Sequence, residues 1–182
     1  MANKIKYGLR NVYYAKATAG ENGVLTYATP VRIPGAVSMS ISPEGETEPF
    51  YADDVIYYQS NSNNGYSGTL EVALLPDSFY EDILGDVTTD GVTVEHANVT
   101  PSEFALLFEF QGDESASRHA FFRCTAARPD VAGSTKEASV SPQTETLNLT
   151  VMPRINDYVV KAKAAATASA YANWFTAVPT VS

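Results

Sequence analysis

The sequence predicts a mainly β protein, either a β-sandwich or a partly closed barrel, with one short flanking helix. Three segments, 37–42, 69–74 and 146–151, alternate strictly between apolar and polar residues, as expected for strands with one buried face. Turn residues separate further short runs rich in Val, Ile, Tyr, Phe and Thr. Only one internal segment has a clear helical pattern. At 182 residues we expect a single domain, 1–182, that folds without disulfides or metal.

The alternating segments divide their side chains between two faces. The apolar set is expected to point into the core: Val37, Met39, Ile41, Leu70, Val72, Leu74, Leu147, Leu149 and Val151. The opposite set is short and, apart from one glutamate, uncharged: Ser38, Ser40, Ser42, Thr69, Glu71, Thr146, Asn148 and Thr150. Solvent-facing strands usually carry Lys, Glu or Arg, which discourage pairing between exposed edges. The lack of such residues makes this polar face unusual.

The remaining elements follow from composition and turn chemistry. Further strands are expected at 5–14, 24–33, 55–59, 92–96, 104–111, 118–127 and 157–163, with turns at 20–23, 90–91 and 111–114, the last closing a hairpin. A helix is expected at 76–85, where Pro and Asp begin the segment and Gly85 can end it. The alanine-rich stretch from 164 to 175 predicts a second, weaker helix.

A long loop at about 43–66 combines polar residues with the aromatic residues Phe50, Tyr51, Tyr57 and Tyr58. One interpretation is that these rings fold back on their own domain. The other is that they pack on a neighbouring subunit, because tyrosine is a common anchor at protein interfaces.

The sequence offers little support for catalysis. It has no glycine-rich phosphate loop and no G-x-S-x-G elbow. A single cysteine, Cys124, excludes an intramolecular disulfide and a thiolate metal cluster, and His96 and His119 have no catalytic spacing. The acidic pairs 53–54 and 113–114 are interpreted as soluble turns. We therefore expect no enzymatic activity, cofactor or metal.

Charge and hydropathy limit the partners. The formal net charge of −9 argues against a general nucleic-acid binder, which needs Lys and Arg to displace counterions from phosphates. There is no N-terminal signal peptide pattern and no apolar run of the roughly 18–20 residues that a membrane span requires. A soluble intracellular protein is the expectation.

Many segments, in the same order along the chain, resemble the major tail protein, or tail tube protein, of long-tailed phages with non-contractile (siphovirus-type) tails. They lie at 6–15, 33–37, 49–53, 63–66, 75–79, 104–110, 133–137 and 142–147. The resemblance covers nearly the whole chain and is least evident at 164–172. The role of the C-terminal segment 164–182 therefore stays open.

The resemblance implies a virion structural protein, made in the bacterial host cytoplasm, that self-assembles into stacked hexameric rings. Such a tube conducts the genome during ejection without binding it specifically, and the implied partners are further copies of the chain and the tape measure, tail tip and tail terminator proteins. No membrane or small-molecule partner is implied. The loop at 43–66 would bridge subunits and rings, with contacts expected at Phe50, Tyr51, Tyr57, Tyr58, Asn63, Asn64 and Tyr66. The polar face would include lumen-facing positions, namely Ser38, Ser40, Ser42, Thr69, Glu71, Thr146, Asn148 and Thr150.

Two other classes fit the residues. A monomeric β-sandwich binding module, for carbohydrate or adhesion, would also use exposed tyrosines and Asn/Asp loops. A capsid decoration protein would be structural without being a conduit. Assembly into rings separates the tube subunit from both.

Overall fold

The computed structural model describes residues 7–111, 117–135 and 142–180. Its elements are β1 (Leu9–Ala19), η1 (Glu21–Gly23), β2 (Leu25–Tyr27), β3 (Val31–Ile33), β4 (Ala36–Glu44), β5 (Thr47–Ala52), β6 (Val55–Asn61), β7 (Gly65–Val72), α1 (Asp77–Phe79), η2 (Tyr80–Leu84), β8 (Val87–Thr89), β9 (Val92–Val94), β10 (Phe104–Phe110), β11 (Arg118–Ala126), β12 (Glu145–Val151) and β13 (Lys161–Ala164). The described part contains no helix long and apolar enough to cross a membrane.

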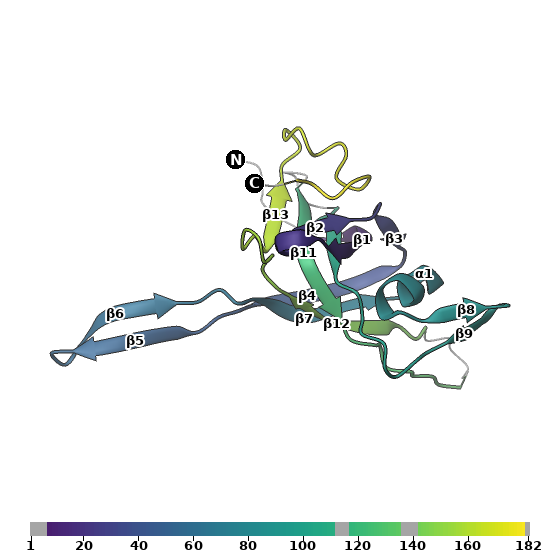
Figure 1. Ribbon diagram of the computed structural model, residues 1–182, viewed down its shortest axis with the longest axis horizontal. Helices are drawn as coiled ribbons and strands as arrows, with labels where there is room; N and C mark the ends of the chain where they lie inside the picture. The colour runs from purple at the N-terminus through teal and green to yellow at the C-terminus, as the bar shows by residue number, and fades with distance from the viewer. Residues whose placement is uncertain (1–6, 112–116, 136–141, 181–182) are drawn as a thin grey trace.

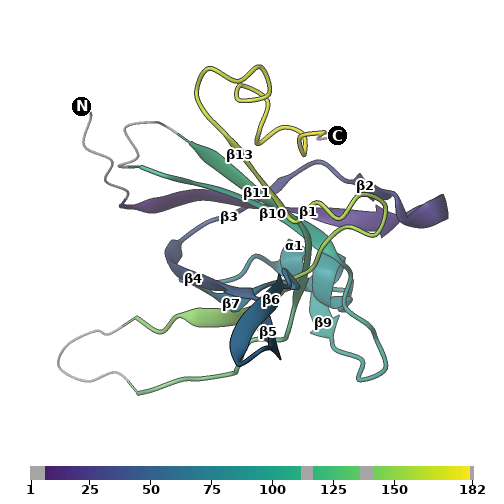
Figure 2. The same cartoon turned by 90° about the vertical axis from the view of Figure 1, so that its left-hand side faces the viewer.

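One large antiparallel sheet forms the body. Its strand order is β2-β1-β10-β11-β12-β7-β4, with β3 paired to β1 and β13 paired to β11. Strand β11 joins two layers, because its first half pairs with β13 and its second half pairs with β12. In Figure 2 the layer containing β1, β10 and β11 lies above the layer containing β4 and β7. The sheet does not close, so the mainly β prediction with one short helix is confirmed as an open, two-layered arrangement.

The larger core fills the space between the layers. It includes side chains from strands of both layers and from the helical segment: Val12, Tyr14, Ile33, Leu70, Val72, Phe79, Ile83, Leu84, Phe104, Leu106, Leu147, Leu149 and Val151. Its members on β7 and β12 alternate with the polar residues, as the period of two requires. The alternation therefore predicted the buried face of β7 and β12 correctly. On β4, Met39 and Ile41 are half-buried and pack against this core.

Val37 and Leu74 were predicted to be buried, and both predictions are wrong. The register between β4 and β7 shifts between Ala36 and Ser38, so Val37 lies in a bulge and is 52% exposed. Leu74 follows the end of β7 and is 67% exposed. Strict alternation in sequence indicates a face only while regular pairing continues.

The helical segment is confirmed at 77–84. α1 continues into a π-helical turn, η2, and Gly85 ends it in the left-handed conformation with φ of 77°. Phe79, Ile83 and Leu84 are buried against the sheet. Asp82 accepts a hydrogen bond from the Tyr14 hydroxyl at 2.9 Å, which fixes the helix to β1.

The expected helix at 164–175 is absent, and this prediction is wrong. After Ala164 the chain forms successive turns, in which the Ala168 amide donates to the Ala165 carbonyl and the Tyr171 amide donates to the Ala168 carbonyl. These turns lay Trp174 over a second apolar cluster on the outer face of β1, β10 and β11. Tertiary contacts thus override the helix preference of alanine.

Several turns were predicted correctly. The segment 20–23 contains the short η1 turn, and 90–91 joins β8 to β9 with φ of 52° at Asp90 and 77° at Gly91. Strands β10 and β11 pair as an antiparallel hairpin, although residues 112–116 of the predicted turn, and with them the acidic pair 113–114, lie outside the described residues. The strand expected at 24–33 is split into β2 and β3.

Candidate assembly surfaces

The polar residues of β4, β7 and β12 form one continuous surface, because the three strands are neighbours in the sheet. The pairing registers place them in three cross-strand rows: Ser38, Glu71 and Thr146; Ser40, Thr69 and Asn148; Ser42, Ser67 and Thr150. We call these nine residues the polar face. The eight residues predicted from sequence are thus brought together. Ser67 was missed, although the alternation extended two residues back from Thr69 would have found it.

Glu71 is the only ionisable group of the polar face. Its carboxylate accepts hydrogen bonds from the Ser38 hydroxyl at 2.8 Å and from the Thr144 hydroxyl at 2.7 Å. The hydrogen bonds from Thr144 and Ser38 hold the pKa of Glu71 below its ordinary value. The face therefore combines neutral hydroxyl and amide groups with one stably ionised carboxylate.

The predicted loop at 43–66 is largely a β-hairpin. We call residues 45–64, between the ends of β4 and β7, the arm; it contains β5 and β6 and projects from one end of the body (Figure 1). Asp53 and Asp54 connect the strands with φ of 51° and 63°, as in the two-residue turns that match strand twist. The acidic pair at 53–54 is thus a turn, as interpreted from sequence. Backbone hydrogen bonds from Ser62 to Glu46 and from Asn64 to Glu44 connect the arm's ladder to that of the body.

The arm exposes large apolar side chains on both faces. They comprise Phe50 (60% exposed), Tyr51 (63%), Val55 (58%), Ile56 (54%), Tyr57 (73%) and Tyr58 (63%). The interpretation in which these tyrosines fold back on their own domain does not agree with this exposure. A two-stranded hairpin with neither face covered is marginally stable in water, so the arm is a surface suited to a partner.

The other predicted contact residues lie at the base of the arm. Asn63 and Asn64 are exposed, and the Asn63 side chain accepts a hydrogen bond from the Gly65 amide at 3.3 Å. Tyr66 differs from the rest, because it packs on its own body. Its ring centroid lies 5.5 Å from that of Phe121, and the Lys161 amine lies 4.6 Å from its ring centroid.

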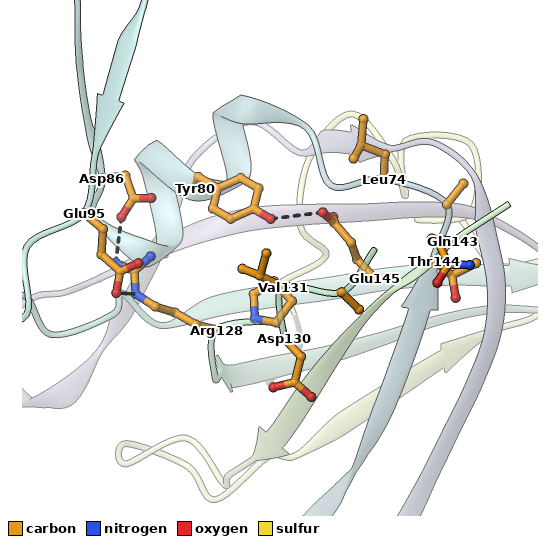
Figure 3. Close-up of a pocket in the computed structure, with 13 residues that line it drawn as sticks. Leu74, Tyr80, Asp86, Glu95, Arg128, Asp130, Val131, Gln143, Thr144 and Glu145 are labelled. Atoms are coloured by element: carbon orange, nitrogen blue, oxygen red, sulfur yellow. Dashed lines mark hydrogen bonds and ion pairs between the residues drawn. The ribbon is translucent and has the colours of Figure 1, made fainter. Parts of the chain in front are cut away.

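A pocket of about 270 Å³ lies beside the helix and β12 (Figure 3). Arg128 bridges Asp86 at 2.6 Å and Glu95 at 2.9 Å. Tyr80 donates a hydrogen bond to Glu145 at 3.4 Å. The pKa of Tyr80 is raised, mainly because the hydroxyl is partly buried and secondly because the Glu145 carboxylate lies beside it. None of the lining residues is His, Cys, Ser or Lys. Arg128 pairs with two of the four acidic residues in the lining, so the pocket keeps a net negative charge.

The other residues considered for chemistry are separate from this pocket. His119 stacks on Phe108 with ring centroids 5.2 Å apart, whereas His96 is exposed outside the strands. Cys124 is buried, and burial raises the pKa of its thiol, which opposes formation of the reactive thiolate. In the described ranges, no group of three or more His, Cys, Asp or Glu side chains is arranged to hold a metal ion.

Comparisons with known proteins identify a similar fold among solved structures. No family model and no curated protein matches the sequence. Among solved structures, a chain in the six-fold symmetrised cryo-EM structure of the anti-feeding prophage baseplate matches with a TM-score of 0.50 and 10% identity, over 92% of this chain and 99% of that chain. A chain of the cap that terminates the anti-feeding prophage tube matches with a TM-score of 0.44 and 9% identity, over 91% and 95%. The first likeness shows that this chain has a fold found in that baseplate.

Proposed function

We propose that the chain is a structural subunit of a phage-tail-like particle that assembles into six-fold rings, and that these rings stack into a tail tube. The observation that carries this proposal is that β4 and β7, which form the polar face together with β12, also lead into the arm. A subunit built in this way presents a surface of small polar side chains and extends a hairpin with exposed apolar side chains from the same sheet. The fold likeness to a chain of a six-fold baseplate supports the symmetry.

The polar face suits the lumen of a DNA conduit. Cationic side chains there would bind phosphates and slow the genome, whereas hydroxyl, amide and carboxylate groups would not. The nine residues of the polar face include no Lys, Arg or His. The net charge of −9 per subunit adds electrostatic repulsion around a ring.

The finer assignment is the tube of a siphovirus-type tail, as the sequence resemblance implies. In that setting the chain is a non-enzymatic virion component, and it contacts other copies of itself, the tape measure protein and the proteins at the tail tip and terminus. Head-to-tail stacking is a heterologous contact that propagates into a filament until another component caps it.

The test is the mass and shape of the purified chain. We expect negative-stain images to show rings or hollow tubes, and light scattering at rising concentration to give masses in multiples of six times 19.6 kDa. The informative variant replaces 47–61 with Asn-Gly, which joins Glu46 to Ser62 by a two-residue hairpin turn. This armless variant should stay folded and should not form tubes.

The matched control is Val92→Thr with Val94→Thr, which reduces exposed apolar surface on the other hairpin. This variant should assemble normally. A wild-type chain that stays monomeric, even with the tail-tip components present, would overturn the tube proposal and favour a monomeric binding module. Normal tubes from the armless variant would exclude the arm from assembly.

A further inference from the structure

A second surface on the body complements the arm. A groove of about 520 Å³ lies between β4 and β13, and both strands contribute side chains to it. Met39 and Ile41 of β4 form one wall, and Lys161 and Lys163 of β13 form the other. Figure 2 shows that the two layers of the body diverge on the side where β4 and β13 lie. The groove thus lies where the two layers separate, at the open side of the sandwich.

The floor of the groove is aromatic. Phe108 lies between His119, which stacks on it at 5.2 Å, and Phe121, whose centroid is 5.8 Å away. Phe110 meets His119 edge-on at 5.6 Å. The volume is within the roughly 300–1,000 Å³ of pockets that bury small organic ligands, so more than one aromatic side chain can enter. Rings of an incoming segment would find offset-stacked and edge-to-face partners already in place.

Charge distinguishes the groove from the arm. Lys161 and Lys163 give the groove two cations, and within the described residues Lys163 has no acidic side chain within ion-pair distance. The arm has the opposite sign, with four acidic residues and no Lys, Arg or His: Glu46, Glu48, Asp53 and Asp54. An acidic hairpin carrying aromatic rings matches a cationic groove with an aromatic floor in both chemistry and charge.

The backbone offers a second kind of complementarity. Over the part of the chain that the structure describes, β4 pairs only with β7 and β13 pairs only with β11. The groove is therefore bordered by two strand edges with free donors and acceptors. An incoming β-strand could add to either edge while its alternate side chains enter the groove.

We infer that this groove, between β4 and β13, receives the arm of a second copy of the chain. The inference rests on the proposed self-assembly and identifies the surface that receives the arm. The arm of the same copy is excluded, because its ladder continues from β4 and β7 and extends away from the body (Figure 1). To reach its own groove, it would have to break that ladder.

Another exposed apolar region fits the arm less well. It lies around the β8–β9 hairpin, where Val87, Val92 and Val94 are exposed. The adjoining pocket contains Asp86, Glu95, Asp130 and Glu145 against a single Arg128. An acidic arm would be repelled there, so charge selects the groove between β4 and β13.

Disulfide trapping between two copies tests the inference. One chain carries Tyr57→Cys on the arm, and a second, affinity-tagged chain carries Lys163→Cys in the groove. The native Cys124 is fully buried and gives little background. On mild oxidation of the mixed full-length chains, we expect a crosslinked heterodimer. The control pairs Tyr57→Cys with Val92→Cys on the β8–β9 hairpin and should give at least tenfold less product.

A charge exchange provides a second measurement. Lys163→Glu should raise the concentration needed for assembly by about tenfold, since it replaces an attraction with a repulsion of similar size. The compensating change is Glu48→Lys, at an exposed position of β5 away from the positive-φ turn at Asp53 and Asp54. Combined with Lys163→Glu, it should restore most of the lost tendency to assemble.

The outcomes separate this inference from the proposed tube. Rings or tubes without the Tyr57–Lys163 crosslink would overturn the groove assignment and leave the tube proposal standing. A crosslink without ring-sized species would support the groove as a self-association site and overturn the six-fold tube. Equal crosslinking of the control pair, or no rescue by the charge exchange, would also refute the inference. A chain with neither crosslink nor assembly would overturn both.

Discussion

Replacement of Trp174 tests whether the C-terminal segment is an integral part of the body. The indole is 2% exposed, packs in the cluster with Leu107, Phe122 and Ala120, and donates a hydrogen bond to the His119 carbonyl at 3.1 Å. Truncation of a buried aromatic residue to alanine costs about 3–5 kcal/mol. The loss of the indole hydrogen bond moves the expected cost toward the upper part of this range. We expect Trp174→Ala to lower the free energy of unfolding by about 4 kcal/mol.

Urea unfolding measures this loss, and far-UV circular dichroism is the suitable signal because Trp174 is the only tryptophan. With an m-value of about 2 kcal/mol/M, the midpoint should fall by roughly 2 M. The melting temperature should fall by roughly 8–16 °C. Trp174→Phe retains most of the buried area and loses the donor, so it should cost about 1 kcal/mol plus a smaller packing term.

The matched control is Tyr57→Ala, which removes another aromatic ring at a position that is 73% exposed. Its free energy of unfolding should stay within about 0.5 kcal/mol of the wild-type value. If Trp174→Ala unfolded at the wild-type midpoint, the segment after β13 would not cover the outer face of the sheet. The reasoning that replaces the predicted helix with an anchored series of turns would then be refuted.

Three further predictions concern the strands of the polar face and the arm. NMR titration should give Glu71 a pKa below that of an ordinary glutamate, and the double variant Ser38→Ala with Thr144→Ala should raise this pKa. Because the pKa of Glu71 is lower in the folded than in the unfolded chain, its contribution to stability is complete above the unfolded pKa and is lost as pH falls through the folded pKa. An unchanged pKa in the double variant would contradict this cause. Gly68→Ala should destabilise the chain by roughly 1–3 kcal/mol in urea unfolding, since a Cβ there would lie 2.0 Å from the Ser40 carbonyl oxygen; wild-type stability would show that the two strands do not approach so closely. Rising salt should weaken assembly if the arm's acids contact lysines, because exposed ion pairs are screened; light scattering that increases with salt would argue for apolar contacts alone.

Much of the body followed from local pattern. The alternation in 69–72 and 146–151 identified both faces of β7 and β12, since each strand has one side on the core and the two strands pair in regular register. The helix at 77–84 was equally readable from its apolar spacing and its final glycine. Where a residue's environment depends on a partner strand, the pattern was insufficient, as the bulge at Val37 shows.

The candidate surfaces were only partly predictable. Polarity selected eight residues of the polar face, but their arrangement in rows depends on β4, β7 and β12 being neighbours, which no local signal encodes. The arm was recognised from its aromatic residues, and the strand expected at 55–59 is confirmed as part of β6. The rest of the arm was treated as a loop, and its partner strand β5 contains Pro49, which is uncommon in strands. The groove was not anticipated, since Phe108 and Lys163 come from strands distant in sequence.

In the proposed assembly, the arm has a consequence for how fast subunits join. It contributes nothing to either core, so its cross-strand hydrogen bonds should open far more often than those of the body, and its amides should exchange with solvent almost unprotected in the free subunit. Each docking event must then fix backbone and side chains that were fluctuating, at a cost in conformational entropy. A single contact is therefore weak, and a subunit held by several neighbours is retained. Growth from an existing end would consequently outpace spontaneous initiation, and a hydrogen-exchange time course over 45–64 would report the transition directly.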